Sequence, residues 1–146
     1  PVMNHYGYTM DQALDILSKK SGLLGLSGVS NDLRLVIEAA QNGNQQAQLA
    51  VDTLCDNILG YIGMYAAYLN GLDALVFTGG IGTNSDILRQ KVCQNLGYLG
   101  LALDQEKNLQ RGDGVISKDT SKVTVWRLKT DEESVVASCV HEFLHQ

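Results

Sequence analysis

The chain has 146 residues, 45% hydrophobic and 18% charged, which is typical of one globular domain or part of a larger one and excludes a disordered chain. Its formal net charge of −5 argues against a general nucleic-acid surface, because phosphates are neutralised by clustered Lys and Arg. The chain contains no run of about 18 apolar residues and no signal-peptide pattern, so we expect no membrane segment and a cytoplasmic location.

The first half of the chain predicts helices separated by glycine-containing breaks. A helix over 9–19 carries an apolar stripe that we expect to lie in the core. The apolar but glycine-punctuated segment 23–29 predicts a buried loop. A second helix is expected to end near Gln41, and a long central helix to run over 44–70.

Strands and helices alternate in the second half. An apolar, β-prone run over 73–78 breaks into glycines, and a helix is expected to follow to about Asn95. A short strand near 99–103, a polar surface stretch, a strand over 123–128 and a last helix over 131–144 complete the chain. This order predicts an α/β fold with a small, mainly parallel sheet.

The three cysteines, Cys55, Cys93 and Cys139, lie far apart on apolar helical positions. An odd number of widely spaced cysteines does not fit a disulfide framework or a zinc site. They predict reduced thiols in the core.

The most informative segment is the break between strand and helix over 77–85. Its glycines allow positive φ and leave no Cβ between the backbone and a ligand. Asn84 or Ser85 can cap the following helix, whose N-terminal N–H groups favour an anion. We interpret this segment as a nucleotide-binding corner.

Three nucleotide-binding turns compete for this corner, beside a glycine turn that binds nothing. A P-loop is excluded because no Lys followed by Ser or Thr comes after the glycines. A Rossmann turn fits Gly80, Gly82 and the spacing to Asp104, but Ser85 occupies the place of its third glycine. The adenosine-binding turn of actin-like and sugar-kinase-like proteins fits Thr78 and the glycine pair after it.

The segment 77–85, Phe-Thr-Gly-Gly-Ile-Gly-Thr-Asn-Ser, resembles the signature of acetate kinases. Further blocks over 20–34, 61–67, 92–96 and 130–133 are similar to blocks of the same family in the same order. The resemblance implies the C-terminal part of an actin-like (ribonuclease H-like) ATPase domain. Residues 1–146 then form one nucleotide-binding domain or a fragment of a longer kinase, which also suits a chain that opens on Pro instead of Met.

The family resemblance implies reversible transfer of the ATP γ-phosphoryl group to acetate, giving acetyl phosphate and ADP with Mg²⁺, in a homodimer. Acetate and propionate both stay open as substrates, because the acyl pocket lies in the family's other part. That part also carries the phosphate-binding first domain and the catalytic arginines and histidines. We therefore assign no catalytic residue here and expect the chain alone to bind nucleotide weakly and to be inactive.

Matched position by position, the resemblance implies two nucleotide-contacting segments and one magnesium ligand. The nucleotide-contacting residues are Asp32, Leu33, Arg34, Gly80, Ile81, Gly82, Thr83 and Asn84, and the magnesium ligand is Glu132. Thr83 stands where the family commonly has Glu, and Asp131 where it commonly has Asn. Without the family, Asp32, Arg34 and Glu132 also fit plain helix-terminal charges.

The C-terminal pattern over 141–145, His-Glu-Phe-Leu-His, is typical of zinc-protease helices. Such a site needs a third protein ligand, and only Gln146 follows the second histidine. We interpret His141 and His145 as structural, with a core stripe on another face of their helix. That stripe contains Val135, Val136, Cys139, Val140 and Phe143.

Overall fold

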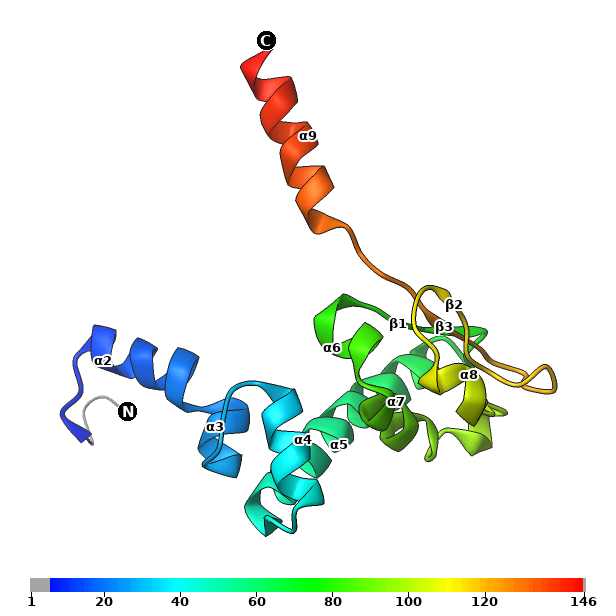
Figure 1. Ribbon diagram of the computed structural model, residues 1–146, viewed down its shortest axis with the longest axis horizontal. Helices are drawn as coiled ribbons and strands as arrows, with labels where there is room; N and C mark the ends of the chain where they lie inside the picture. Colours follow the sequence, from blue (N-terminus) through cyan, green and yellow to red (C-terminus); the bar gives the residue numbers. More distant parts are fainter. Residues whose placement is uncertain (1–5, 146) are drawn as a thin grey trace. The chain divides into compact units, whose positions relative to one another are not determined.

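The computed structural model describes residues 6–145, except for the side chain of Glu132 (Figure 1). The chain divides into two compact units. Unit 1 extends to Tyr68 and is helical, whereas unit 2 begins at Leu69 and contains the sheet. None of the described helices is both long and apolar enough to cross a bilayer. A single domain over 1–146 stays a prediction.

Unit 1 is built from helices, as the first half of the sequence predicts. They are α2 (Met10–Asp15), the π-helical segment η1 (Ile16–Lys20), α3 (Gly22–Ser27), α4 (Leu33–Gln41) and α5 (Gln45–Tyr68). Both α3 and α4 pack against α5. The buried apolar residues lie on α4 and α5 and include Leu33, Val36, Ala47, Ala50 and Val51. The predicted bounds of α4 and α5 are confirmed within a few residues.

Two predictions for the start of unit 1 were wrong. Thr9 caps α2 in a capping box with Gln12, but the apolar stripe of this first helical stretch is exposed, with Leu17 at 70%. The segment predicted as a buried loop forms α3. Its glycines bound a helix instead of breaking one, because Gly28 takes the left-handed conformation, φ 66°, that ends a helix at its C-terminus.

Unit 2 carries a three-stranded sheet with helices between the strands. Its elements are β1 (Ala74–Phe77), α6 (Gly79–Asn84), α7 (Asp86–Cys93), the 3₁₀ turn η2 (Gly97–Leu99), α8 (Gln105–Leu109), β2 (Gly114–Val115), β3 (Thr124–Arg127) and α9 (Glu132–Leu144). The strand order is β1-β3-β2. Strand β1 pairs in parallel with β3, with Ala74 opposite Thr124 and Phe77 opposite Arg127. Only the short strand β2 is antiparallel, so the prediction of an α/β fold is confirmed.

One strand was predicted in the wrong place and another was missed. Residues 99–103 form the end of η2 and a single bridge between Leu103 and Ser117. Strand β2 lies in the polar stretch predicted to be surface loop. A strand of two residues has no alternating pattern to read.

The core of unit 2 draws on β1, α7, β3 and the segments that connect them. It is formed by Phe77, Leu88, Val92, Cys93, Leu96, Leu101, Ile116, Val123 and Val125. Burial raises the pKa of Cys93 to about 12, so this thiol stays protonated at neutral pH. Buried thiols at Cys55 and Cys93 confirm two of the three cysteine predictions, whereas Cys139 is exposed.

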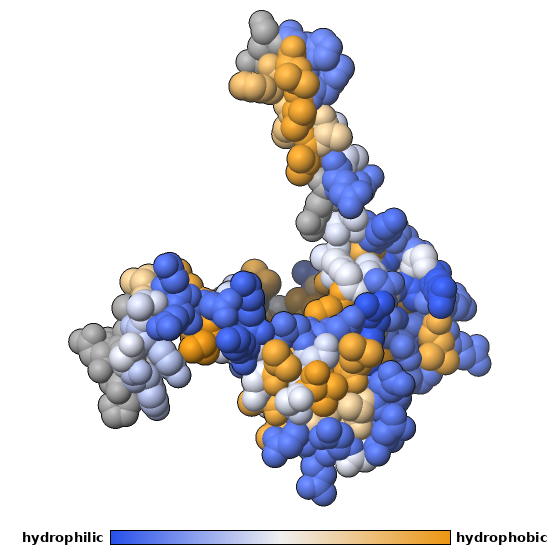
Figure 2. Space-filling view, turned by 60° about the vertical axis from the view of Figure 1, so that its left-hand side comes forward, coloured by the Kyte–Doolittle hydropathy of each residue, from blue (hydrophilic) through white to orange (hydrophobic). Residues whose placement is uncertain are grey.

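Helix α9 exposes every side chain that the structure describes on it. Figure 2 shows hydrophobic residues gathered along one side of this helix. The prediction that this apolar stripe is buried in the core is therefore wrong, because Val136 is 62% and Phe143 is 76% exposed. The rings of His141 and His145 lie 4.1 Å apart between centroids, and the described residues contain no group of three potential metal ligands.

Candidate nucleotide-binding site

The predicted nucleotide corner begins where β1 ends. Thr78 is extended, with φ −141° and ψ 178°, and Gly79 then takes φ 68° to turn the chain into α6. This positive φ favours glycine at position 79. Residues 79–84 form a short helix of six residues, where the sequence predicted only a tight turn.

Two glycines of α6 differ in what surrounds them. A Cβ at Gly82 would lie 3.3 Å from the carbonyl carbon of Phe77, so Gly82 allows α6 to pack on the end of β1. A Cβ at Gly80 would meet no atom within 4 Å, and Gly80 is exposed. Gly82 thus serves packing inside the chain, while the backbone at Gly80 is open to a ligand.

The polar side chains of α6 turn back onto their own helix. The Thr83 hydroxyl donates to the Gly79 carbonyl at 2.6 Å, and the Asn84 amide nitrogen donates to the Gly80 carbonyl at 2.8 Å. These bonds orient the exposed Asn84 amide, whose oxygen can accept from a ligand. Ile81 exposes 46% of its surface and offers an apolar contact beside it.

Ser85, and not Asn84, caps the helix after the corner. Its hydroxyl oxygen accepts from the backbone N–H of Leu88 at 3.2 Å, and Asp86 lies in the first turn of α7. The capping prediction named both candidates, and the structure selects Ser85.

Sequence reasoning missed two buried residues beneath this corner, Arg89 on α7 and Asn108 on α8. The Arg89 guanidinium donates to the carbonyls of Gly82 and Thr83, each at 2.8 Å from Nη1. Burial lowers the pKa of Arg89 most, followed by the charge of Arg127. Nothing in the local pattern signals this role, because a charged residue on a short helix is usually solvated.

The second predicted segment, 32–34, opens α4 in unit 1. Asp32 is the N-cap residue of α4, and its Oδ1 accepts from the backbone N–H of Arg34 at 2.9 Å. The Arg34 guanidinium also pairs with this carboxylate, with Nε 3.0 Å from Oδ1. The side chain of Leu33 is buried in unit 1, which leaves only its backbone for a ligand.

Asp32 is expected to titrate near pH 2 in an NMR pH titration of its carboxyl carbon. Hydrogen bonds from the Arg34 side chain, and then from its backbone, hold the pKa at about 2 instead of 3.8. Because the folded pKa is depressed, the pair stabilises the folded chain above pH 3.8 and loses this contribution as the pH falls through about 2. Arg34→Met should return the midpoint toward 3.8, whereas a midpoint of 3.8 in the unmodified chain would contradict the pairing.

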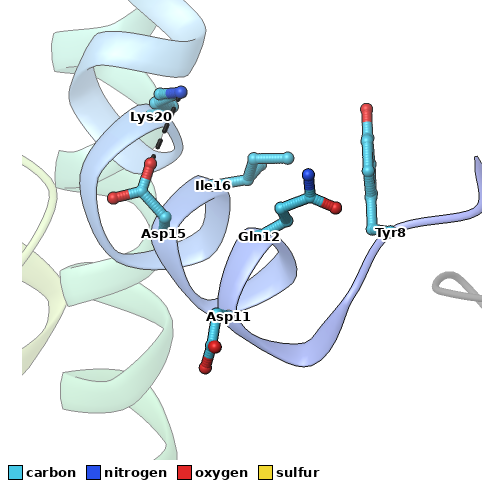
Figure 3. A pocket seen from close by; sticks show the side chains of 6 residues that line it. All are labelled: Tyr8, Asp11, Gln12, Asp15, Ile16 and Lys20. Atoms are coloured by element: carbon cyan, nitrogen blue, oxygen red, sulfur yellow. Dashed lines mark ion pairs between the residues drawn. The ribbon is translucent and has the colours of Figure 1, made fainter.

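Residues that would support the alternatives occupy other roles. Asp104, required by a Rossmann site, caps α8 by accepting from the N–H groups of Glu106 and Lys107, both at 3.0 Å from Oδ1. An open pocket in unit 1 contains none of the predicted residues, and an ion pair between Asp15 and Lys20 lies on its wall (Figure 3).

The predicted site residues fall into three groups. The segment 32–34 lies in unit 1, the segment 80–84 forms most of α6 in unit 2, and Glu132 is the first residue of α9. Since the Glu132 side chain is outside the described part, its role as a magnesium ligand stays a prediction. The described side chains alone gather no set of three carboxylate, histidine or cysteine ligands.

A model of the Acetokinase family matches residues 2–138. The chain belongs to the acetokinase family. It is 50% identical over 131 residues to the acetate kinase of Acholeplasma laidlawii, a match that covers 90% of this chain and 33% of that protein. The family resemblance of the sequence is therefore confirmed.

Solved structures of acetokinase relatives share the fold. The crystal structure of Porphyromonas gingivalis acetate kinase matches with a TM-score of 0.85 and 43% identity over 98% of this chain and 36% of that one. A propionate kinase from Francisella tularensis matches with a TM-score of 0.80 and 34% identity over 90% and 34%. The chain thus spans about a third of these relatives, and its helix-rich α/β architecture is that of a C-terminal part of an actin-like ATPase fold.

Proposed function

We propose that this chain supplies the adenosine side of a nucleotide cleft in an acetate kinase. The complete enzyme would transfer the γ-phosphoryl group of ATP reversibly to acetate, giving acetyl phosphate and ADP. Membership of the acetokinase family and the names of its relatives support this proposal. Propionate is the alternative acceptor, favoured by the similarity to a propionate kinase, and the choice between them belongs to parts outside this third of the enzyme.

The observation that carries the proposal is the open backbone of α6 at Gly80. Gly79 turns the chain, Gly82 packs on β1 and the side chain of Asn84 is oriented by its own helix. Gly80 neither turns the chain nor packs on β1, and its missing Cβ leaves room for a flat ring system to lie on the backbone. In this proposal Ile81 contacts the adenosine through apolar surface and Asn84 accepts a hydrogen bond.

The other proposed contacts come from unit 1 and α9. Asp32, Leu33 and Arg34 would form the second nucleotide segment, with polar contact from the exposed Asp32–Arg34 pair. Glu132 would provide one carboxylate to Mg²⁺, which often takes only one or two protein ligands besides phosphate and water. When bound, the ion offsets charge on the phosphates. A homodimer and a cytoplasmic location are part of the same proposal.

Gly80→Ala is expected to weaken ADP binding about tenfold, measured by calorimetric titration with ADP and Mg²⁺. The new methyl group would enter the space where the ligand lies, without meeting an atom of the chain. Because Ala favours helices over Gly, the free energy of unfolding should stay equal or rise by up to about 1 kcal/mol.

Gly97→Ala is the matched control for this experiment. Gly97 is also exposed, begins the 3₁₀ turn η2, and has no atom within 4 Å of an added Cβ. This variant should leave ADP affinity unchanged. Unchanged ADP affinity in Gly80→Ala, or binding of NAD in preference to ADP by the unmodified chain, would contradict the proposed function.

A further inference from the structure

Arg89 is a buried cation that joins three elements of unit 2. It stands on α7 with 2% exposure, and its guanidinium donates to the Gly82 and Thr83 carbonyls of α6. On the other side it donates from Nε to Oδ1 of Asn108 and from Nη2 to the main-chain oxygen of Asn108, each at 2.7 Å. These four bonds all go to uncharged oxygens.

Burying a charged guanidinium among uncharged partners costs free energy. Its hydrogen bonds offset this cost, and two of them go to carbonyls of α6. Helix α6 has six residues, three of them the glycines Gly79, Gly80 and Gly82. Such a short, glycine-rich helix is unstable by itself, and its last carbonyls have no partners within the helix. Arg89 satisfies two of these carbonyls and so fixes the C-terminal end of α6.

Asn108 keeps the guanidinium of Arg89 in place. Its amide oxygen receives Nε, and its amide nitrogen donates to the Asp86 carbonyl at 3.0 Å in the first turn of α7. Both the donor and the acceptor of this buried side chain are therefore used. The orientation of the guanidinium toward α6 is determined by α8, which is more than a dozen residues further along the chain.

We propose that Arg89, oriented by Asn108, is a positioning residue that holds α6 in the conformation that accepts the nucleotide. This inference rests on the proposed function, because α6 carries Gly80, Ile81 and Asn84. Arg89 acts through the backbone of α6 and has no contact with the ligand itself.

Arg127 provides a matched comparison in the same unit. It is also a buried arginine, 3% exposed, and its guanidinium donates to the carbonyls of Lys107, Gln110 and Gly112. None of these carbonyls belongs to α6. Replacing either arginine disturbs a buried guanidinium that is bonded to carbonyls, but only one of the two replacements reaches the nucleotide helix.

Arg89→Lys and Arg127→Lys are compared for ADP affinity by calorimetry, after folding is verified by circular dichroism. A lysine ammonium cannot bridge two carbonyls and Asn108 together. If about a tenth of the molecules then keep α6 in place, Arg89→Lys should bind ADP about tenfold more weakly. Arg127→Lys should lose stability but keep ADP affinity within about twofold of the unmodified chain.

A second readout follows α6 directly. The backbone N–H of Ser85 donates to the Ile81 carbonyl at 3.0 Å and closes the end of α6. Hydrogen exchange at this amide should accelerate about tenfold in Arg89→Lys and stay unchanged in Arg127→Lys. If Arg89→Lys fails to fold, Asn108→Ala, which removes only the orienting side chain, is expected to change both readouts several-fold in the same direction.

Equal loss of ADP affinity in the two lysine variants would overturn the positioning role, since general destabilisation would then explain both. Unchanged affinity in folded Arg89→Lys would overturn it as well. Absence of ADP binding in the unmodified chain would instead contradict the proposed function. Hydrogen exchange at the Ser85 amide would then still test whether Arg89 stabilises α6.

Discussion

The chain of 146 residues is expected to form acetyl phosphate at least about 10³-fold more slowly than a complete acetate kinase. Phosphoryl transfer depends on positive groups held around the transferred phosphoryl group. Arg34, in the predicted segment 32–34, already pairs with Asp32, and Arg89, beneath α6, already donates to carbonyls of that helix. The measurement is a hydroxamate assay of acetyl phosphate with ATP, Mg²⁺ and acetate.

The matched comparison is a complete acetate kinase at the same molar concentration. Adding the other two thirds of an acetate kinase polypeptide to this chain should restore part of the activity, since the missing phosphate and acetate contacts are expected there. We propose that this chain binds the nucleotide while the other two thirds carry the catalytic groups. Turnover by this chain alone at a rate near that of the complete enzyme would contradict this proposal. Retained ADP binding without turnover is the result that supports it.

Leu88→Ala is expected to lower the free energy of unfolding by about 3 kcal/mol. Leu88 is 2% exposed in the core of unit 2, and its backbone N–H is already held by the Ser85 cap. Removing its side chain leaves a cavity in this core, which the surrounding side chains fill only in part. Loss of dispersion contacts around the cavity adds to the lost hydrophobic burial.

Urea unfolding followed by fluorescence measures this effect. The single tryptophan, Trp126, lies on β3 and reports on unit 2. Leu109→Ala is the control, because Leu109 on α8 is 69% exposed and its loss should cost less than about 0.5 kcal/mol. Equal destabilisation by the two variants would contradict the core assigned to unit 2.

The sequence predicted best those elements whose residues carry a strong local signal. The long apolar periodicity that produces α5 and the β-prone runs at 74–77 and 124–127 gave the right types and nearly the right bounds. Helix α3 was missed because three glycines within 22–28 were interpreted as breaks, although two of them form the ends of the helix. Whether a glycine ends a helix or lies in a loop depends on its backbone φ, and the amino-acid sequence does not reveal that angle.

The candidate site was predictable only where its residues are contiguous. The glycines of α6 and the capping residue Ser85 follow from local chemistry and are found in the predicted corner. Arg89 and Asn108 are 19 residues apart and meet only in the folded unit. Asn108 even lies in the stretch predicted as polar surface, because the sequence does not indicate which polar residue will be buried to satisfy another.

The three cysteines differ in burial, which makes the one on the last helix available for selective labelling. Cys55 and Cys93 are buried, whereas Cys139 is exposed on α9. A thiol-reactive dye would therefore mark α9 selectively under native conditions. Energy transfer from Trp126 to that dye would then follow the distance between α9 and the sheet in solution, as nucleotide or the remainder of the kinase is added.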